Sequence, residues 1–197
     1  MNQRPTNNER NEETMNNQNY DRKYAVYIPE CCAPRELVLE IRELSDEELT
    51  TETEVGEPIP CPTVEYIEKA VGGWFQAVRL ALPEPETAGP IRDYWGWVNE
   101  EGQRLEMSPN LLASILYGGV ILGPMIITGD DGFGDAPALT MAEIVDLRDS
   151  ILGHLQRLAN RGFRGGAYTL KLYAPWREND PIIYNITAKK RTASKGE

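Results

Sequence analysis

One segment of the sequence constrains the fold more than any other, LTMAEIVDLRDSILGHLQRLANRG, from Leu139 to Gly162. Thr140 and Glu143 have the spacing of a capping box, and Gly162 is well placed to end a helix. The apolar residues between them recur at helical spacing and form one stripe: Ile144, Leu147, Ile151, Leu152, Leu155, Leu158 and Ala159. The apolar stripe of such a helix must be buried against another element, so the rest of the chain has to supply an apolar surface.

Most of the remaining sequence is typical of short strands joined by turns. Alternating apolar and polar residues or β-rich composition predict strands at 23–29, 36–44, 74–82, 93–98, 103–107 and 120–129, and two more within 166–190. Capping residues and glycine stops predict two further helices at 62–73 and 108–119. Hairpins dominate this order, which predicts an α+β fold, a mainly antiparallel sheet of hairpins with three helices packed on it.

Composition divides the chain into four stretches. Residues 1–22 are rich in Asn, Glu and Arg and nearly devoid of large apolar side chains, which predicts a disordered N-terminal tail. Residues 23–135 are expected to form the core α+β domain. Residues 136–188 would form a C-terminal amphipathic helix and a strand pair packed on that core, and residues 189–197 a basic tail. The sequence leaves open whether the C-terminal part is a separate unit.

The formal net charge of −11 limits the partners. Binding to duplex nucleic acid needs Lys and Arg to displace counterions, so an acidic chain is a poor candidate for it. The sequence has no apolar run long enough for a transmembrane helix, and its first residues lack the apolar stretch of a secretory signal. We therefore expect a cytoplasmic protein that does not bind membranes, and the oligomeric state stays open.

Residues that carry catalysis or bind metals are sparse. The chain has three cysteines, Cys31, Cys32 and Cys61, and a single histidine, His154, so no familiar zinc set can be assembled. No motif pairs a nucleophile with a base. We therefore predict no catalytic residue, no metal and no cofactor. His154 lies at the boundary of the apolar stripe, and we interpret it as a surface or boundary histidine.

Two adjacent acids, Glu100 and Glu101, raise the possibility of an acid/base pair. They follow Asn99 and precede Gly102, between two predicted strands. This pattern predicts a type I turn followed by a left-handed glycine at a bulge. The two carboxylates would then diverge into water, which argues against catalysis.

The motif VGG ends at Gly73, NEEG occupies 99–102, PN occupies 109–110 with Ala113 following, and the stretch GPMIITG runs from Gly123 to Gly129. In this order the motifs resemble the family catalogued as domain of unknown function 3846, from phages, plasmids and bacteria. The resemblance covers roughly residues 24–128, and the acidic stretch at 45–62 and the region after Leu139 depart from it. It implies a phage or mobile-element context and no reaction. We interpret its motif residues as turn and cap residues: Gly72, Gly73, Asn99, Glu100, Glu101, Gly102, Pro109, Asn110, Gly123 and Gly129.

Three hypotheses for the function follow. The first is a non-catalytic, protein-binding accessory module that engages a host or element-encoded protein, with Trp95 and Trp97 as its anchor unless both are buried in the core. The alternative is a binder of a small anionic ligand or nucleotide, with Arg161 and Arg164 among the glycines of NRGFRGGAY. The third is a carboxylate- or metal-dependent enzyme. A contiguous exposed apolar patch would favour the first, a deep pocket with Arg161 or Arg164 at its mouth the second, and clustered acids in a cleft the third.

Overall fold

A computed structural model of the chain describes residues 22–30, 35–51, 59–82, 94–132, 134–163 and 166–188. The predicted tails at 1–22 and 189–197 lie outside these residues, apart from Arg22. The helices are α2 (Val64–Val71), α3 (Leu111–Tyr117), α4 (Met141–Asn160) and the short 3-10 helix η1 (Asp46–Glu48). The strands of the main sheet are β1 (Tyr24–Ile28), β2 (Glu36–Glu43), β5 (Phe75–Arg79), β6 (Tyr94–Asn99), β7 (Met125–Gly129), β8 (Ala167–Tyr173) and β9 (Ile182–Thr187).

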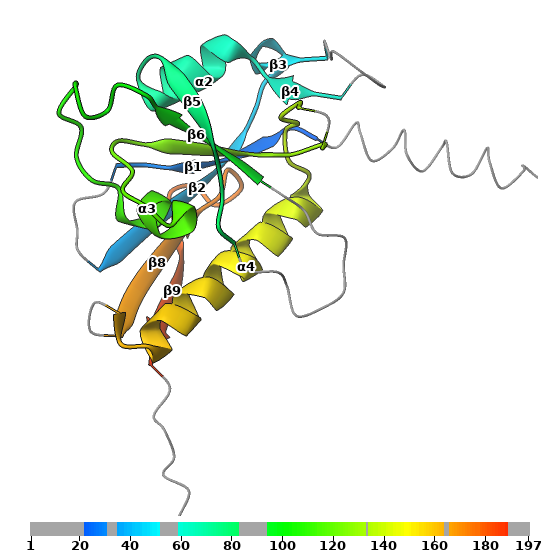
Figure 1. Ribbon diagram of the computed structural model, residues 1–197. Coiled ribbons are helices and arrows are strands. Elements are labelled where there is room, and N and C mark those ends of the chain that lie inside the picture. The colour runs from blue at the N-terminus through cyan, green and yellow to red at the C-terminus, as the bar shows by residue number, and fades with distance from the viewer. Residues whose placement is uncertain are drawn as a thin grey trace, which may run out of the picture.

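The seven strands form one sheet in the order β5-β6-β7-β1-β2-β8-β9 (Figure 1). Every neighbouring pair is antiparallel except β2 and β8, which run parallel. The prediction of an α+β fold with a mainly antiparallel sheet and three helices is confirmed. A second, two-stranded sheet pairs β3 (Leu49–Thr50) with β4 (Cys61–Pro62).

Helices cover both faces of the main sheet (Figure 1). On one face, α3 and α4 enclose the larger core, in which Leu116, Leu147 and Leu155 are fully buried together with Ile127 of β7. On the other face, α2 packs through Ile67 and its neighbours on a smaller core. The alternation along the strands produces this arrangement, because successive side chains point to opposite faces.

Helix α4 forms where the sequence predicts it. Thr140 Oγ1 accepts a hydrogen bond from the backbone N–H of Glu143 at 3.2 Å, and the Glu143 carboxylate accepts one from the backbone N–H of Thr140 at 2.8 Å. This capping box satisfies two backbone donors at the helix start. The chain leaves α4 at Gly162, with a φ of +77°, and returns as β8 beside β2. The C-terminal strands therefore extend the same sheet as β1 and β2.

The strand predicted at 103–107 is wrong. Strand β6 ends at Asn99, and residues 100–106 form consecutive turns. The Asn99 side chain accepts a hydrogen bond from the N–H of Glu101 at 2.8 Å, and the N–H of Leu105 donates to the Glu101 carbonyl at 2.9 Å. A hairpin strand has no place here, because both edges of β6 are already occupied by β5 and β7.

The left-handed conformation predicted for Gly102 is also wrong, because the positive φ of this turn, 54°, belongs to Glu106. Gly102 is nonetheless buried, and a Cβ placed on it would lie 3.2 Å from Leu122. Close packing is therefore what favours a glycine at this position.

Candidate functional site

The two tryptophans predicted as a protein anchor are half-buried on the face of the sheet that carries α2. The indole N–H of Trp97 donates a hydrogen bond to Thr128 Oγ1 at 2.9 Å, and its ring meets that of Phe75 edge-on, 5.4 Å between centroids. The guanidinium of Arg79 lies 5.3 Å from the ring centroid of Trp95. These contacts fit a structural role for both rings, although neither is fully buried.

The adjacent acids Glu100 and Glu101 do not face each other as a buried pair. Glu100 is exposed, and Glu101 is half-buried and pairs with Arg104, whose Nε donates to the Glu101 carboxylate at 2.9 Å. Among the residues that the structure describes, no group of three or more His, Cys, Asp or Glu side chains is placed to hold a metal ion.

The two asparagines of the family-like motifs connect elements that are distant in sequence. Asn99 Nδ2 donates to the Val71 carbonyl at 3.3 Å, which ties β6 to the end of α2. Asn110 Oδ1 accepts from the Ala113 N–H at 3.1 Å and so caps α3, while its Nδ2 donates to the Gly123 carbonyl at 2.9 Å.

The glycines and the proline of the same motifs occupy turns, strand ends and helix ends. Gly72 ends α2 with a φ of +83°, Gly73 and Gly123 also have positive φ, and Gly129 ends β7. Pro109 pairs with Leu122 in an isolated β-bridge. A structural role explains each of these positions.

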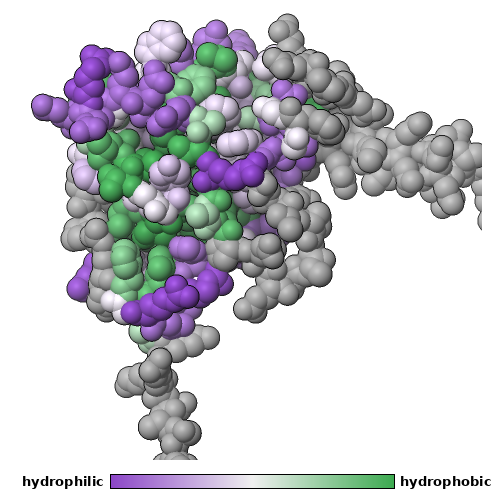
Figure 2. Space-filling view, in the orientation of Figure 1, coloured by the Kyte–Doolittle hydropathy of each residue, from purple (hydrophilic) through white to green (hydrophobic). Residues whose placement is uncertain are grey.

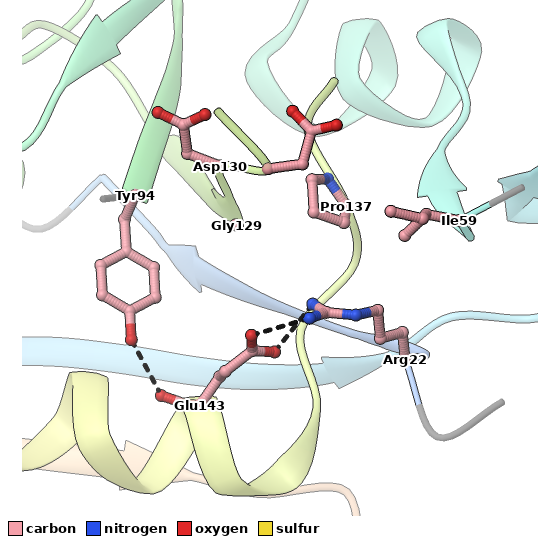
Figure 3. A pocket seen from close by; sticks show the side chains of 8 residues that line it. Arg22, Ile59, Tyr94, Gly129, Asp130, Pro137 and Glu143 are labelled. Atoms are coloured by element: carbon pink, nitrogen blue, oxygen red, sulfur yellow. Dashed lines mark hydrogen bonds and ion pairs between the residues drawn. The ribbon is translucent and has the colours of Figure 1, made fainter. Parts of the chain in front are cut away.

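One cavity of about 220 Å³ lies where β6 and β7 meet the start of α4 (Figure 3). The guanidinium of Arg22 donates to both carboxylate oxygens of Glu143, at 2.9 and 3.0 Å, and to the Ala138 carbonyl at 3.1 Å. The Tyr94 hydroxyl donates to the Glu143 carbonyl at 3.4 Å. Arg22 was assigned to the N-terminal tail from the sequence, whereas the structure fixes it against α4. No sequence pattern indicates this pairing.

Asp130 and Asp131 also line this cavity. The carboxylate of Asp130 points away from the Arg22–Glu143 pair (Figure 3). Asp130 accepts from the N–H of Gly132 at 2.8 Å, and Asp131 accepts from the N–H groups of Gly134 and Asp135, each at 3.1 Å. Both acids therefore stabilise the turn that follows β7, so the cavity is a structural junction.

A larger cleft of about 520 Å³ opens between the C-terminal half of α4 and the residues that follow β5. We call it the α4 cleft, and it is lined by Ala81, Leu82, His154, Arg157, Leu158 and Arg161. Leu82 and Leu158 are partly buried and pack against the larger core. Figure 2 shows hydrophobic residues gathered on the face of the molecule that carries α3 and α4.

Three basic or titratable residues stand on one side of α4 at this cleft. His154, Arg157 and Arg161 are spaced by three and four residues, which places them in one row along the helix. Arg157 and Arg161 are exposed, and within the described ranges neither guanidinium forms an ion pair. The Arg157 side chain runs back along the helix, so that its Nη1 would lie 3.6 Å from a Cβ added at Gly153.

His154 is half-buried in this row. Burial lowers the pKa of its imidazole below the usual 6.5, and the neighbouring charges of Arg157 and Arg161 lower that pKa further. All three causes disfavour the charged imidazolium. His154 is therefore mainly neutral at pH 7 while the cleft holds no negative charge.

Arg161 thus lines an open cleft rather than the deep pocket that the anion-binding hypothesis predicts, whereas Arg164 lies outside the described residues. Sequence reasoning missed Arg157 and placed His154 only at a boundary. The helical spacing 154–157–161 was available as a signal, because it puts three basic or titratable residues in one row on a helix that the sequence predicts.

Cys61 offers no alternative reactive site. It is buried, its Sγ lies 3.4 Å from the Ile59 carbonyl oxygen, and burial raises the pKa of its thiol to about 11. Since the thiolate is the nucleophilic form, this thiol is unreactive at neutral pH in the folded protein. Cys31 and Cys32 lie outside the described residues.

Comparison of the chain with known protein families, with curated proteins and with solved structures found no match. The resemblance to domain of unknown function 3846, and the phage or mobile-element context that it implies, stay predictions. In the described part of the chain, no helix combines the length and the apolar character needed to cross a membrane.

Proposed function

We propose that this chain is a non-catalytic binding protein and that the α4 cleft holds a small anionic ligand. The observation that carries the proposal is the row of His154, Arg157 and Arg161 along a cleft whose other walls are apolar. The protein-binding hypothesis came first from the sequence. We now favour the anion-binding hypothesis, and the position of Arg161 in the lining of the α4 cleft supports it.

Most of the other arginines that the structure describes contact a carboxylate: Arg22, Arg42, Arg79, Arg104, Arg148 and Arg177. The exposed Arg35 is the exception. Carboxylates are abundant in a chain with 31 acidic and 20 basic residues, yet Arg157 and Arg161 contact none among the described residues. Basic residues near a helix C-terminus are favoured by the helix dipole. The dipole does not explain why the two stand together at a cleft.

The chemistry of these side chains suits a carboxylate, phosphate or sulfate group. A guanidinium presents parallel N–H donors that match two oxygens of such a group. An anion bound between Arg157 and Arg161 would also offset the repulsion that these charges exert on a protonated His154. Binding should therefore be accompanied by partial proton uptake at His154, and it should strengthen as the pH falls toward 5.5.

Sulfate is a suitable first probe, because it does not titrate between pH 5 and 8. We would titrate ¹⁵N-labelled, tag-free full-length chain with sodium sulfate, against sodium chloride at matched ionic strength, and follow the backbone amides by NMR. The proposal predicts saturable shifts centred on residues 154–161. The double variant Arg157→Gln/Arg161→Gln should lose them, and Arg148→Gln, on the same helix but paired with Asp149, should keep them.

Shifts that do not saturate, or that survive in the double variant, would count against an anion site in the α4 cleft.

A second function, protein binding, is favoured by one specific observation. Trp74, between α2 and β5, is 70% exposed. Large aromatic side chains are usually buried, and exposed tryptophans are enriched among the residues that anchor protein interfaces. Trp74 is therefore a better anchor than the half-buried Trp95 and Trp97. If the Trp176→Ala variant still binds a protein partner and the Trp74→Ala variant does not, this function is supported. Equal binding of the partner by both variants would contradict it.

A further inference from the structure

The walls of the α4 cleft are chemically divided. Ala81, Leu82 and Leu158 supply an apolar surface, and the two leucines rest on the larger hydrophobic core. Arg157 and Arg161 stand at the exposed rim. A ligand that fills this cleft meets hydrocarbon on one side and guanidinium groups on the other.

We infer that the ligand is an amphiphilic acid, in which an anionic head group is attached to an aliphatic chain. The inference rests on the proposed function and names the chemical class of ligand for the same cleft. The head group would lie between Arg157 and Arg161 at the rim, and the chain would cover Leu82 and Leu158.

The apolar surface is what distinguishes this ligand from a purely inorganic anion. An inorganic anion would leave Leu82 and Leu158 in contact with water, whereas an attached alkyl chain removes that surface from water, which is favourable in proportion to the area covered. The volume of about 520 Å³ lies within the range of about 300–1,000 Å³ that is usual for small-molecule sites. The aliphatic stems of Arg157 and Arg161 can also lie along apolar surface while their guanidinium groups stay in water.

A series of straight-chain carboxylates tests the inference. Acetate, butanoate, hexanoate and octanoate carry the same head group, and their binding to the tag-free full-length chain can be measured by isothermal titration calorimetry below micelle-forming concentrations. Each methylene that becomes fully covered should tighten binding up to about four-fold. Octylammonium chloride has the same chain and the opposite charge, and it should not bind.

Variants separate the contributions of the head group and the chain. Leu82→Ser should flatten the dependence of affinity on chain length, with Leu105→Ser, at an exposed leucine away from the cleft, as the matched control. Arg157→Gln/Arg161→Gln should weaken all four carboxylates together. Circular dichroism of each variant verifies that it is folded.

The outcomes distinguish this inference from the proposed function. If sulfate binds but octanoate binds no tighter than acetate, the anion site stands and the amphiphilic ligand is overturned. Tight binding of octylammonium would also overturn it. If neither sulfate nor any carboxylate binds, both the inference and the proposed function fail.

The same chemistry occurs in free fatty-acid-like molecules and in bilayer lipids. Co-sedimentation with phosphatidylglycerol vesicles, compared with phosphatidylcholine vesicles, separates the two sources. Octanoate binding without co-sedimentation supports a free amphiphile, whereas arginine-dependent co-sedimentation with the anionic vesicles supports a lipid head group. Co-sedimentation that is equal for both vesicle types, or that persists in Arg157→Gln/Arg161→Gln, contradicts recognition of an anionic head group.

Discussion

Individual side chains, Asn110 above all, fix the geometry of the turns. Asn110 is 1% exposed, caps α3 through Oδ1, and donates from Nδ2 to the Gly123 carbonyl at 2.9 Å and to the Ile28 and Pro29 carbonyls at 3.3 Å. One amide therefore joins the end of β1, the start of α3 and the turn before β7. The side-chain amide carries two N–H donors and one acceptor oxygen, so it can hydrogen-bond to all three elements.

Replacing Asn110 tests this junction. Asn110→Ala should lower the free energy of unfolding by about 2–4 kcal/mol, because the helix loses its cap and buried carbonyls lose their donor. Asn110→Asp keeps the cap acceptor but places a carboxylate oxygen against those carbonyls, so it should be at least as destabilising. Urea unfolding followed by circular dichroism measures both. An aspartate variant as stable as the wild type would show that the Nδ2 contacts contribute little.

His154 provides a second prediction, which concerns how the stability of the folded protein depends on pH. Because its pKa is lowered in the folded state, the unfolded chain binds the proton more readily. Stability should therefore be lost as the pH falls through 6.5, until the pH reaches the folded-state pKa. The difference in unfolding free energy between wild type and His154→Gln, measured at pH 7.5 and 5.5, isolates this effect from the carboxylates. A difference that does not change with pH would contradict it.

The candidate site was only partly predictable at the scale of residues. Arg161 was singled out from its glycine-rich surroundings, which indicated a turn near a basic side chain. The cleft beside it was not predictable, because Leu82 reaches α4 only through the sheet, more than 70 positions earlier in the chain than Arg157. The pairing of Arg22 with Glu143 was hidden for the same reason.

At the scale of elements, local signals decided which predictions succeeded. Helix α4 was predicted because a capping box, a continuous stripe and a glycine stop agree with one another. The prediction of a strand at 103–107 was wrong. Alternation of apolar and polar residues in a short segment does not indicate whether a sheet edge is free to pair with that segment. The turn at Asn99 was anticipated, but its continuation through Leu105 depends on backbone hydrogen bonds that composition does not reveal.

Gly153 in the middle of α4 provides a prediction for an element. Glycine is unfavourable inside a helix, so Gly153→Ala should raise the free energy of unfolding by about 0.5–1 kcal/mol. The added Cβ would meet the Arg157 guanidinium at 3.6 Å, an ordinary contact. Gly162→Ala is the matched control and should destabilise, because its φ of +77° is unfavourable for alanine. Thermal unfolding of both variants measures the effect. A loss of stability in Gly153→Ala would show that the glycine is needed for packing.

At the scale of the whole molecule, β8 connects the two halves of the chain. It lies between β2 and β9 and pairs in parallel with β2, so residues 136–188 complete a sheet that residues 23–135 begin. The sequence predicted both strands but could not specify this position, because a parallel pairing across a long crossover has no local signature.

This arrangement predicts that the N-terminal part does not fold alone. A chain ending at residue 135 would lack α4 and would expose Ile127, Leu39 and the edge of β2. We expect it to aggregate or to lack fixed tertiary structure, whereas the full chain should unfold in one transition, with coincident urea curves from tryptophan fluorescence and circular dichroism. A folded, monomeric 1–135 fragment would show that the C-terminal region is a separate unit.

The most direct test of the proposed anion site uses the single histidine of the chain. NMR titration of tag-free protein gives the pKa of His154 in sodium chloride and in sodium sulfate at matched ionic strength. We expect a His154 pKa below 6.5 in chloride and a higher pKa in sulfate, with no such rise in Arg157→Gln/Arg161→Gln. A His154 pKa that is the same in both salts, at sulfate concentrations up to the solubility limit of the protein, would contradict the anion site in the α4 cleft.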